Sequence, residues 1–125
     1  MAVQLIRQSC ERRTIQKYGG GGFTIGDGRF AGSVLILPDG VTVWPVTTFA
    51  NLSEGAFDGV LKQAPAFDVC LLGCGPRVAR LPAALRTYLS AAGLQIEPME
   101  TGAACRTFNV LAAEGRALAA ALIAI

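Results

Sequence analysis

A strand, helix and strand pattern over residues 67–99 is the feature that most constrains the fold of this chain. Residues 67–72 form a short apolar run bounded by proline and glycine, which is typical of a strand buried on both faces. Pro82 suits the first position of the helix, Gly93 suits its left-handed C-cap, and residues 94–99 form the next strand. Because such a crossover joins parallel neighbours with a right-handed connection, the pattern predicts an open α/β sheet.

Glycine and proline divide the first part of the chain into short extended segments. Residues 14–25 alternate polar and apolar side chains around the glycine run 19–22, which predicts two short strands joined by a flexible bend. Residues 32–37 and 41–44, joined by Pro38-Asp39-Gly40, predict a hairpin. A glycine run can also cradle phosphate, but a P-loop needs a preceding strand and a G-K-[ST] ending, which this run lacks.

Two further elements are indicated by the sequence. Ser53 suits the N-cap of a helix in which Leu52 and Phe57 form a hydrophobic staple, and Pro65 ends that helix. Residues 116–125 are apolar on every side, so their periodicity fits a helix or a strand equally well.

Length and composition indicate one domain spanning residues 1–125, with residues 1–13 as a flexible N-terminus. The chain has 125 residues, of which 52% are hydrophobic and 16% charged, enough for one core without long disordered tails. The net charge is +2 and the basic residues form no stripe, which argues against nucleic-acid binding. No run approaches the ~18 apolar residues of a spanning helix, so we expect no membrane insertion. The expected location is the bacterial cytoplasm, with reduced cysteines.

Residues 99–116 form the first candidate site, because they combine a strand end, a capped turn and a polar helix start. Thr101 can accept from the free N–H groups of the following helix, which places Cys105 and Arg106 in the first turn. The positive end of a helix dipole attracts anions and lets a thiol lose its proton more easily. The alternative is that Thr101 is only a cap and Cys105 only part of the core.

A second loop should lie beside this segment. Ligands of open α/β sheets gather beyond the carboxyl ends of the parallel strands, where both Gly73-Cys74-Gly75 and Thr101-Gly102 are predicted. Glycines leave backbone N–H groups approachable, and Arg77 or Arg106 can add a charged partner for a carboxylate or phosphate. The two loops therefore predict an anion pocket.

The structural alternative is that the glycines only permit a tight turn while Arg106 pairs with a carboxylate such as Glu97 or Glu114. Asn109, one turn further along the helix, either faces the pocket or binds the backbone of the glycine-rich ribbon, and we expect the second. The candidate ligand-binding residues are Gly73, Cys74, Gly75, Arg77, Thr101, Gly102, Cys105, Arg106 and Asn109.

The absence of histidine from the sequence excludes Ser-His-Asp and Cys-His catalysis and histidine-ligated zinc or haem. The lysines are limited to Lys17 and Lys62, and the acids form no pair at a convincing acid/base spacing. We therefore assign no catalytic residue, metal or cofactor. A redox alternative requires Cys70, Cys74 and Cys105 to converge at adjacent strand ends, with Cys105 as the reactive thiol.

Several motifs resemble those of one known family. They run in order along nearly the whole chain: Y-G-G-G-G-F at 18–23, G-S-V-L-I-L-P at 32–38, Trp44, L-L-G-C-G at 71–75, L-P at 81–82 and the segment 99–116. Together they resemble the small α/β domain of mitochondrial complex I assembly factor 3 and its bacterial and archaeal relatives, a domain of unknown function. Cys74 departs from the Thr or Ser expected after the preceding glycine.

This resemblance implies a single three-layer α/β domain with a central mixed five-strand sheet, helices on the sheet and the N-terminal glycine-rich β ribbon packed against it. Residues 116–125 would form a closing central strand antiparallel to its neighbours. The resemblance also implies a non-enzymatic assembly protein whose partners are respiratory complex subunits. The alternative function is a small anionic-ligand binding protein, or an unrecognised enzyme, that uses the crevice at the strand carboxyl ends.

Overall fold

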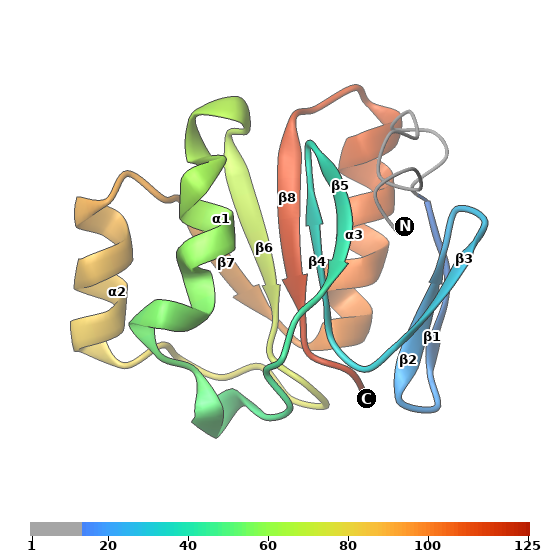
Figure 1. The fold of residues 1–125 in the computed structure, drawn as a ribbon, viewed down its shortest axis with the longest axis horizontal. Coiled ribbons are helices and arrows are strands. Elements are labelled where there is room, and N and C mark those ends of the chain that lie inside the picture. Colours follow the sequence, from blue (N-terminus) through green and yellow to red (C-terminus); the bar gives the residue numbers. More distant parts are fainter. Residues whose placement is uncertain (1–13) are drawn as a thin grey trace.

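The computed structural model describes residues 14–125, and the segment 1–13, for which we expect flexibility, lies outside the described residues. The strands are β1 (Ile15–Gly19), β2 (Gly22–Ile25), β3 (Gly28–Ala31), β4 (Val34–Leu37), β5 (Gly40–Val43), β6 (Val69–Gly73), β7 (Ile96–Met99) and β8 (Leu118–Leu122). The helices are α1 (Asp58–Lys62), α2 (Ala83–Ala91) and α3 (Thr101–Ala113), with 3-10 turns over Phe49–Asn51, Glu54–Phe57 and Ala64–Ala66. Figure 1 shows them in three layers.

The central sheet has five strands in the order β5-β4-β8-β6-β7. β6 and β7 pair in parallel and α2 connects them, so the crossover predicted over residues 67–99 is confirmed. β4 and β5 form the predicted hairpin, with Leu37 opposite Gly40 at its turn. The mixed five-strand sheet implied by the family resemblance is therefore confirmed as well.

The direction of β8 differs from the expectation. The resemblance implied a strand antiparallel to its neighbours, but β8 is antiparallel only to β4 and runs parallel to β6. The reason is that α3 joins β7 to β8 as a second helical crossover, which returns the chain to the end of the sheet where β6 also begins. The ambiguous run 116–125 is thus a central strand, and its small buried side chains allow the layers on both faces to approach closely.

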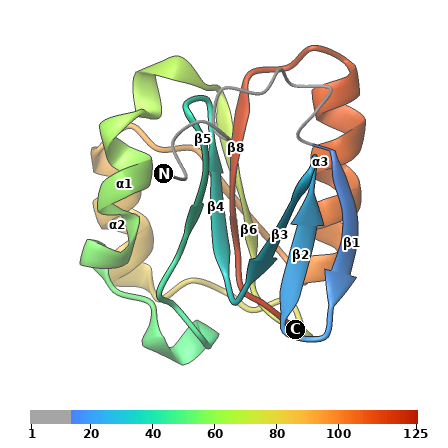
Figure 2. The same ribbon diagram turned by 45° about the vertical axis from the view of Figure 1, so that its right-hand side comes forward.

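Each face of the sheet is covered by its own hydrophobic core. On one face, α1 and α2 pack over a core that includes Trp44, Phe57 and Leu89. On the other face, α3 and the ribbon pack over a core that includes Phe23 and Phe108 (Figures 1 and 2). Within residues 14–125, no helix has the length and apolar content needed to cross a bilayer.

The helical segment after Ser53 is more irregular than its pattern predicts. Ser53 precedes the 3-10 turn Glu54–Phe57 without making a side-chain cap bond, and α1 covers only Asp58–Lys62. Gly55 and Gly59 lie inside this segment, and each glycine costs roughly 1 kcal/mol relative to alanine in a helix. The segment therefore forms a 3-10 turn, the short helix α1 and a second 3-10 turn in succession instead of one continuous helix.

The ends of α2 follow the sequence signals closely. Pro82, predicted at the first helical position, instead occupies the N-cap, one residue before α2 begins at Ala83. Gly93 has a φ of +86°, the left-handed conformation expected after a helix. The Leu94 N–H donates to the Leu89 carbonyl at 2.9 Å, which closes the last turn and directs the chain into β7.

The N-terminal ribbon has a third strand that the sequence pattern did not predict. β1, β2 and β3 pair in antiparallel order, and β3 follows a tight turn at Gly26-Asp27. Gly20 and Gly21 have φ values of +63° and +81°, so the glycine run forms the turn between β1 and β2. The Gly21 N–H donates to the Ile125 carbonyl at 2.7 Å and ties this turn to the segment beyond β8.

Asn109 of α3 fastens the ribbon to the rest of the structure. Its Oδ1 accepts from the Ile15 N–H at 2.8 Å, and its Nδ2 donates to the Ile15 carbonyl at 2.9 Å. β1 is an edge strand of the ribbon, so the amide takes the place of a neighbouring strand. The expectation that Asn109 binds the ribbon backbone is confirmed.

Replacing Asn109 with alanine is expected to lower the free energy of unfolding by about 1–3 kcal/mol, because the Ile15 N–H and carbonyl lose their partners. Urea denaturation measures this loss, and amide exchange at Ile15 should accelerate. Val110→Ala is the matched control, since Val110 is the next residue of α3 and is 58% exposed; its effect should stay below about 0.5 kcal/mol. Equal losses in the two variants would contradict a specific role for Asn109.

Candidate functional site

The two loops predicted to share a site lie side by side at the carboxyl ends of β6 and β7. The Thr101 N–H donates to the Gly75 carbonyl at 2.8 Å, and the Cys74 N–H donates to the Met99 carbonyl at 2.7 Å. These bonds extend the parallel pairing of β6 and β7 into the bends that follow. The expected proximity of the loops is confirmed.

The space between the loops is filled by Thr101, which has no exposed surface. Its hydroxyl accepts from the Gly75 N–H at 2.9 Å and donates to the Ile123 carbonyl at 2.7 Å. A Cβ added at Gly73 would lie 2.9 Å from the Thr101 Oγ1 and 3.1 Å from Leu122, so only glycine fits there. The interpretation of Thr101 as the N-cap of α3 is wrong: Thr101 is the first helical residue, and its hydroxyl crosslinks the ends of β6 and β8.

Glu100 caps α3 instead. Its Oε1 accepts from the Gly102 N–H at 2.8 Å, and a carboxylate is favoured at the positive end of a helix dipole. Arg106, 63% exposed, donates to the Tyr18 hydroxyl at 2.7 Å and pairs with the Glu100 Oε2 at 3.4 Å. Arg106 therefore pairs with Glu100 and not with Glu97 or Glu114, and the helix start already holds a carboxylate of the chain itself.

The buried cysteines do not converge. Cys70 and Cys74 belong to the core under α1 and α2, whereas Cys105 belongs to the core under α3 on the opposite face of the sheet. Burial raises the pKa of the Cys105 thiol to about 12, although the Arg106 guanidinium lowers it in part. Cys105 lies in the second turn of α3, so the expectation of an easily ionised thiol in the first turn is wrong.

The carboxyl ends of β6 and β8 open into a groove of ≈ 490 Å³, which we call the carboxyl-end groove. Its walls are the loop 47–50, the loop 74–79 and residues 123–124, which lie together at the lower edge of Figure 1. Of the predicted ligand residues, Cys74, Gly75 and Arg77 line it. The others do not: Gly73, Thr101, Gly102, Cys105, Arg106 and Asn109 lie under it or on the α3 side.

Sequence patterns missed the other wall of this groove. Phe49 and its neighbours in the loop 47–50 are brought to the end of β6 by the path of the chain after β5, which no local pattern reveals. Val78 was also missed, although an apolar side chain in a loop rich in proline, glycine and arginine is a signal that could have found it. Val78 is 65% exposed and lines the groove.

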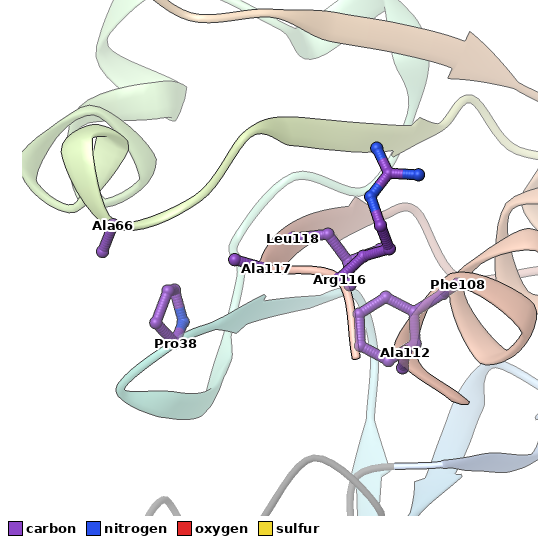
Figure 3. A pocket seen from close by; sticks show the side chains of 7 residues that line it. All are labelled: Pro38, Ala66, Phe108, Ala112, Arg116, Ala117 and Leu118. Atoms are coloured by element: carbon purple, nitrogen blue, oxygen red, sulfur yellow. The ribbon is translucent and has the colours of Figure 1, made fainter. Parts of the chain in front are cut away.

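Two other hollows lie away from the carboxyl-end groove. One is a pocket near the start of β8, with a volume of ≈ 240 Å³. Figure 3 shows Pro38 and Ala66 on one side of it and Phe108 on the other. The Arg116 guanidinium extends away from Pro38 and Ala66, so this pocket is walled mainly by apolar groups. The other hollow, of ≈ 280 Å³, lies between α2 and β7 and has Arg80 at one side. Within residues 14–125, no three acidic, histidine or cysteine residues are grouped so that they could hold a metal ion.

The fold and the site define a class of protein: a small three-layer α/β domain whose strand-end polar groups bond to one another beneath an apolar groove. The chain belongs to the family described as "Protein of unknown function (DUF498/DUF598)", whose model matches residues 15–123. The family membership expected from the sequence motifs is therefore confirmed.

Relatives and solved structures agree with this family. The human protein named "NADH dehydrogenase [ubiquinone] 1 alpha subcomplex assembly factor 3" is 32% identical over 95% of this chain, and the chain spans 65% of the length of that relative. An uncharacterized protein of Rhodobacter capsulatus is 37% identical over 87% of this chain and 82% of its own length. A crystal structure titled as an outer membrane protein from Bartonella henselae has a TM-score of 0.84 at 39% identity, covering 90% of this chain and 95% of that one.

Thr101→Val is expected to lower the free energy of unfolding by about 2–5 kcal/mol, because it preserves the shape of the side chain but leaves the buried Gly75 N–H and Ile123 carbonyl unpaired. Thr101→Ser keeps the hydroxyl and should lose less. Thr107→Val, at a half-buried position of the same helix, is the control for adding valine to α3. Urea denaturation of the three variants gives the comparison, and a fully stable Thr101→Val protein would contradict the proposed crosslink.

The thiols of Cys70 and Cys105 are expected to resist alkylation in the folded protein. Burial raises the pKa of each to about 12 from 9.0, so at pH 8 the folded chain holds roughly a thousandfold less thiolate at these positions. The iodoacetamide rate, measured against pH in a Cys10→Ser background and compared with the urea-unfolded chain, tests this. A labelling midpoint near pH 9 in the folded protein would refute the assignment.

The same pKa shifts predict that the free energy of unfolding falls as pH rises from about 9 to 12, because the thiols of the unfolded chain lose their protons at a lower pH than those of the folded chain.

Proposed function

We propose that this chain is a non-enzymatic interaction protein that acts in the assembly of a respiratory complex in the bacterial cytoplasm. The observation that carries the proposal is the similarity to the human protein named as an assembly factor of NADH dehydrogenase, at 32% identity. The similarity extends over 95% of this chain, so it takes in nearly all of the described fold. The similarity is therefore not limited to one isolated motif.

The internal bonding at the strand ends supports binding over catalysis. Thr101 uses its hydroxyl within the fold, Glu100 caps α3, and Arg106 is held by Tyr18 and Glu100. Cys105 is buried, with a pKa raised to about 12. Thr101, Glu100 and Arg106 thus have partners within the fold, and these bonds stabilise the arrangement of the strand ends.

The carboxyl-end groove is the surface that we assign to the client protein. Phe49, Ile123 and Ala79 give it apolar walls, and Val78 stands at its rim. Burying one valine side chain of this kind is worth about 1.5–3 kcal/mol, which is enough to raise affinity tenfold or more. A partner that places an apolar side chain in the groove would cover Val78 at the same time.

Val78→Asp is expected to weaken client binding by about tenfold or more, because it places a charge where an apolar side chain is to be buried. The experiment is affinity purification of the tagged chain, after crosslinking, from a respiring bacterium that carries this chain and complex I. The wild-type chain should recover complex I subunits, quantified by mass spectrometry, and Val78→Asp should not.

Val110→Asp is the matched control, because Val110 is similarly exposed and lies on α3, away from the groove. It should recover the same subunits as the wild-type chain. A strain that lacks the chain should also contain less assembled complex I in its membranes. Normal complex I levels in that strain, together with no recovery of its subunits, would overturn the proposed function.

A further inference from the structure

The distribution of charge divides the described chain into two parts. Residues 69–96, from β6 through α2 into β7, carry a formal charge of +3 from Arg77, Arg80 and Arg86 and contain no aspartate or glutamate. The remainder, residues 14–68 and 97–125, has five basic and eight acidic residues, a formal charge of −3. The segment 69–96 therefore has a net positive charge, although five other basic residues lie elsewhere in the described chain and Glu97 follows within β7.

These arginines are available to a partner. All three are exposed. Within residues 14–125 the one salt bridge joins Arg106 and Glu100, so none of these three arginines is ion-paired there. Exposed arginines without a partner add little to the stability of a fold. Their guanidinium groups are, however, well suited to pairing with carboxylates in two-point contacts.

The arginines line two hollows, of which the carboxyl-end groove is the more apolar. Arg77 lines the carboxyl-end groove next to Val78, whereas Arg80 and Arg86 line the ≈ 280 Å³ hollow between α2 and β7, together with Leu81 and Ile96. The segment 76–81 separates the two hollows and contributes to both. Both hollows thus combine arginine with apolar side chains, and we call the two together the arginine surface.

The backbone at this side does not favour a partner strand. The Gln95 and Met99 carbonyls accept hydrogen bonds from the Cys70 and Cys74 N–H groups. The backbone N–H and C=O groups of residues 95, 97 and 99 therefore point toward β6, and those of residues 96 and 98 point toward the open edge of the sheet. Pro98 has no N–H to offer there, and proline at such a position protects an edge from strand pairing. Recognition at this surface must then depend on side chains.

We propose that the arginine surface binds an acidic segment of a client protein, with carboxylates on Arg77, Arg80 and Arg86 and an apolar side chain in the carboxyl-end groove. This inference rests on the proposed function, because it names the chemistry of the client that the interaction protein recognises. Charge complementarity selects the acidic partner, and the groove selects one that carries an apolar anchor. Glutamate-rich segments with interspersed leucines have this composition.

A synthetic peptide tests the proposal without any respiratory client. A fluorescein-labelled peptide of alternating glutamate and leucine residues should bind the full chain in an anisotropy titration. Its affinity should fall at least about tenfold in the triple variant Arg77→Glu, Arg80→Glu, Arg86→Glu, since each close pair is replaced by a like-charge contact. Raising the salt from 50 to 500 mM should weaken binding as well.

The matched control is Lys17→Glu, Arg29→Glu, Arg116→Glu, which changes the net charge by the same amount at exposed positions on the ribbon and beyond α3. This variant should retain most of the affinity. Peptides with glutamine for glutamate, or with alanine for leucine, should each bind more weakly. Circular dichroism and urea denaturation of both triple variants establish that the chain remains folded.

Several results would overturn the proposal. Equal loss of affinity in both triple variants would mean nonspecific attraction to net charge. Undiminished binding of the alanine peptide, with displacement by citrate, would indicate a small-anion site. Phosphatidylglycerol vesicles that bind through the same arginines while the peptide does not would indicate a membrane surface, and dimerisation lost in the arginine variant would indicate a second copy of this chain. Peptide binding that persists when no complex I subunit is recovered would refute the proposed function alone.

Discussion

The hydroxyl of Thr101 is the interaction on which the arrangement of the strand ends depends. It accepts from Gly75 after β6 and donates to Ile123 after β8, so a single buried atom joins both strands to the first residue of α3. Two consecutive helical crossovers bring these segments to the same edge of the sheet, and the missing side chain at Gly73 leaves room for the threonine. Without this hydroxyl the Gly75 N–H and the Ile123 carbonyl would be buried without a hydrogen-bond partner, which would lower the free energy of unfolding.

Because the polar groups bond inward, the surface above them is apolar. The same bends that Thr101 holds together provide Cys74, Gly75 and Ile123 to the floor of the carboxyl-end groove. The start of α3, which elsewhere could attract an anion, is covered by Glu100 and Tyr18. The position that general rules assign to a ligand in an open α/β sheet is thus retained as a hollow, with mainly apolar walls and Arg77 in its lining.

Local sequence patterns predicted the elements whose signals are local. The crossover over residues 67–99, the β4–β5 hairpin and the turn at Gly93 follow from apolar runs bounded by proline and glycine. The role of Thr101 could not be predicted in this way, since its partners are 26 and 22 residues distant in the sequence. The prediction of an easily ionised Cys105 thiol was wrong for a related reason. The helix dipole depends on local sequence, but the ribbon and the sheet that bury this thiol and raise its pKa come from distant segments.

The exposed arginines of residues 69–96 are expected to affect the rate of association with a partner more than the stability of the fold. Unpaired surface charges are screened beyond about 8 Å at physiological salt, so Arg77, Arg80 and Arg86 do little to hold β6, α2 and β7 together. In the interaction that we propose, the formal charge of +3 on residues 69–96 would attract an acidic protein toward the carboxyl-end groove. Apolar contact in the groove would govern the lifetime of the proposed complex, because dissociation must expose that surface to water again.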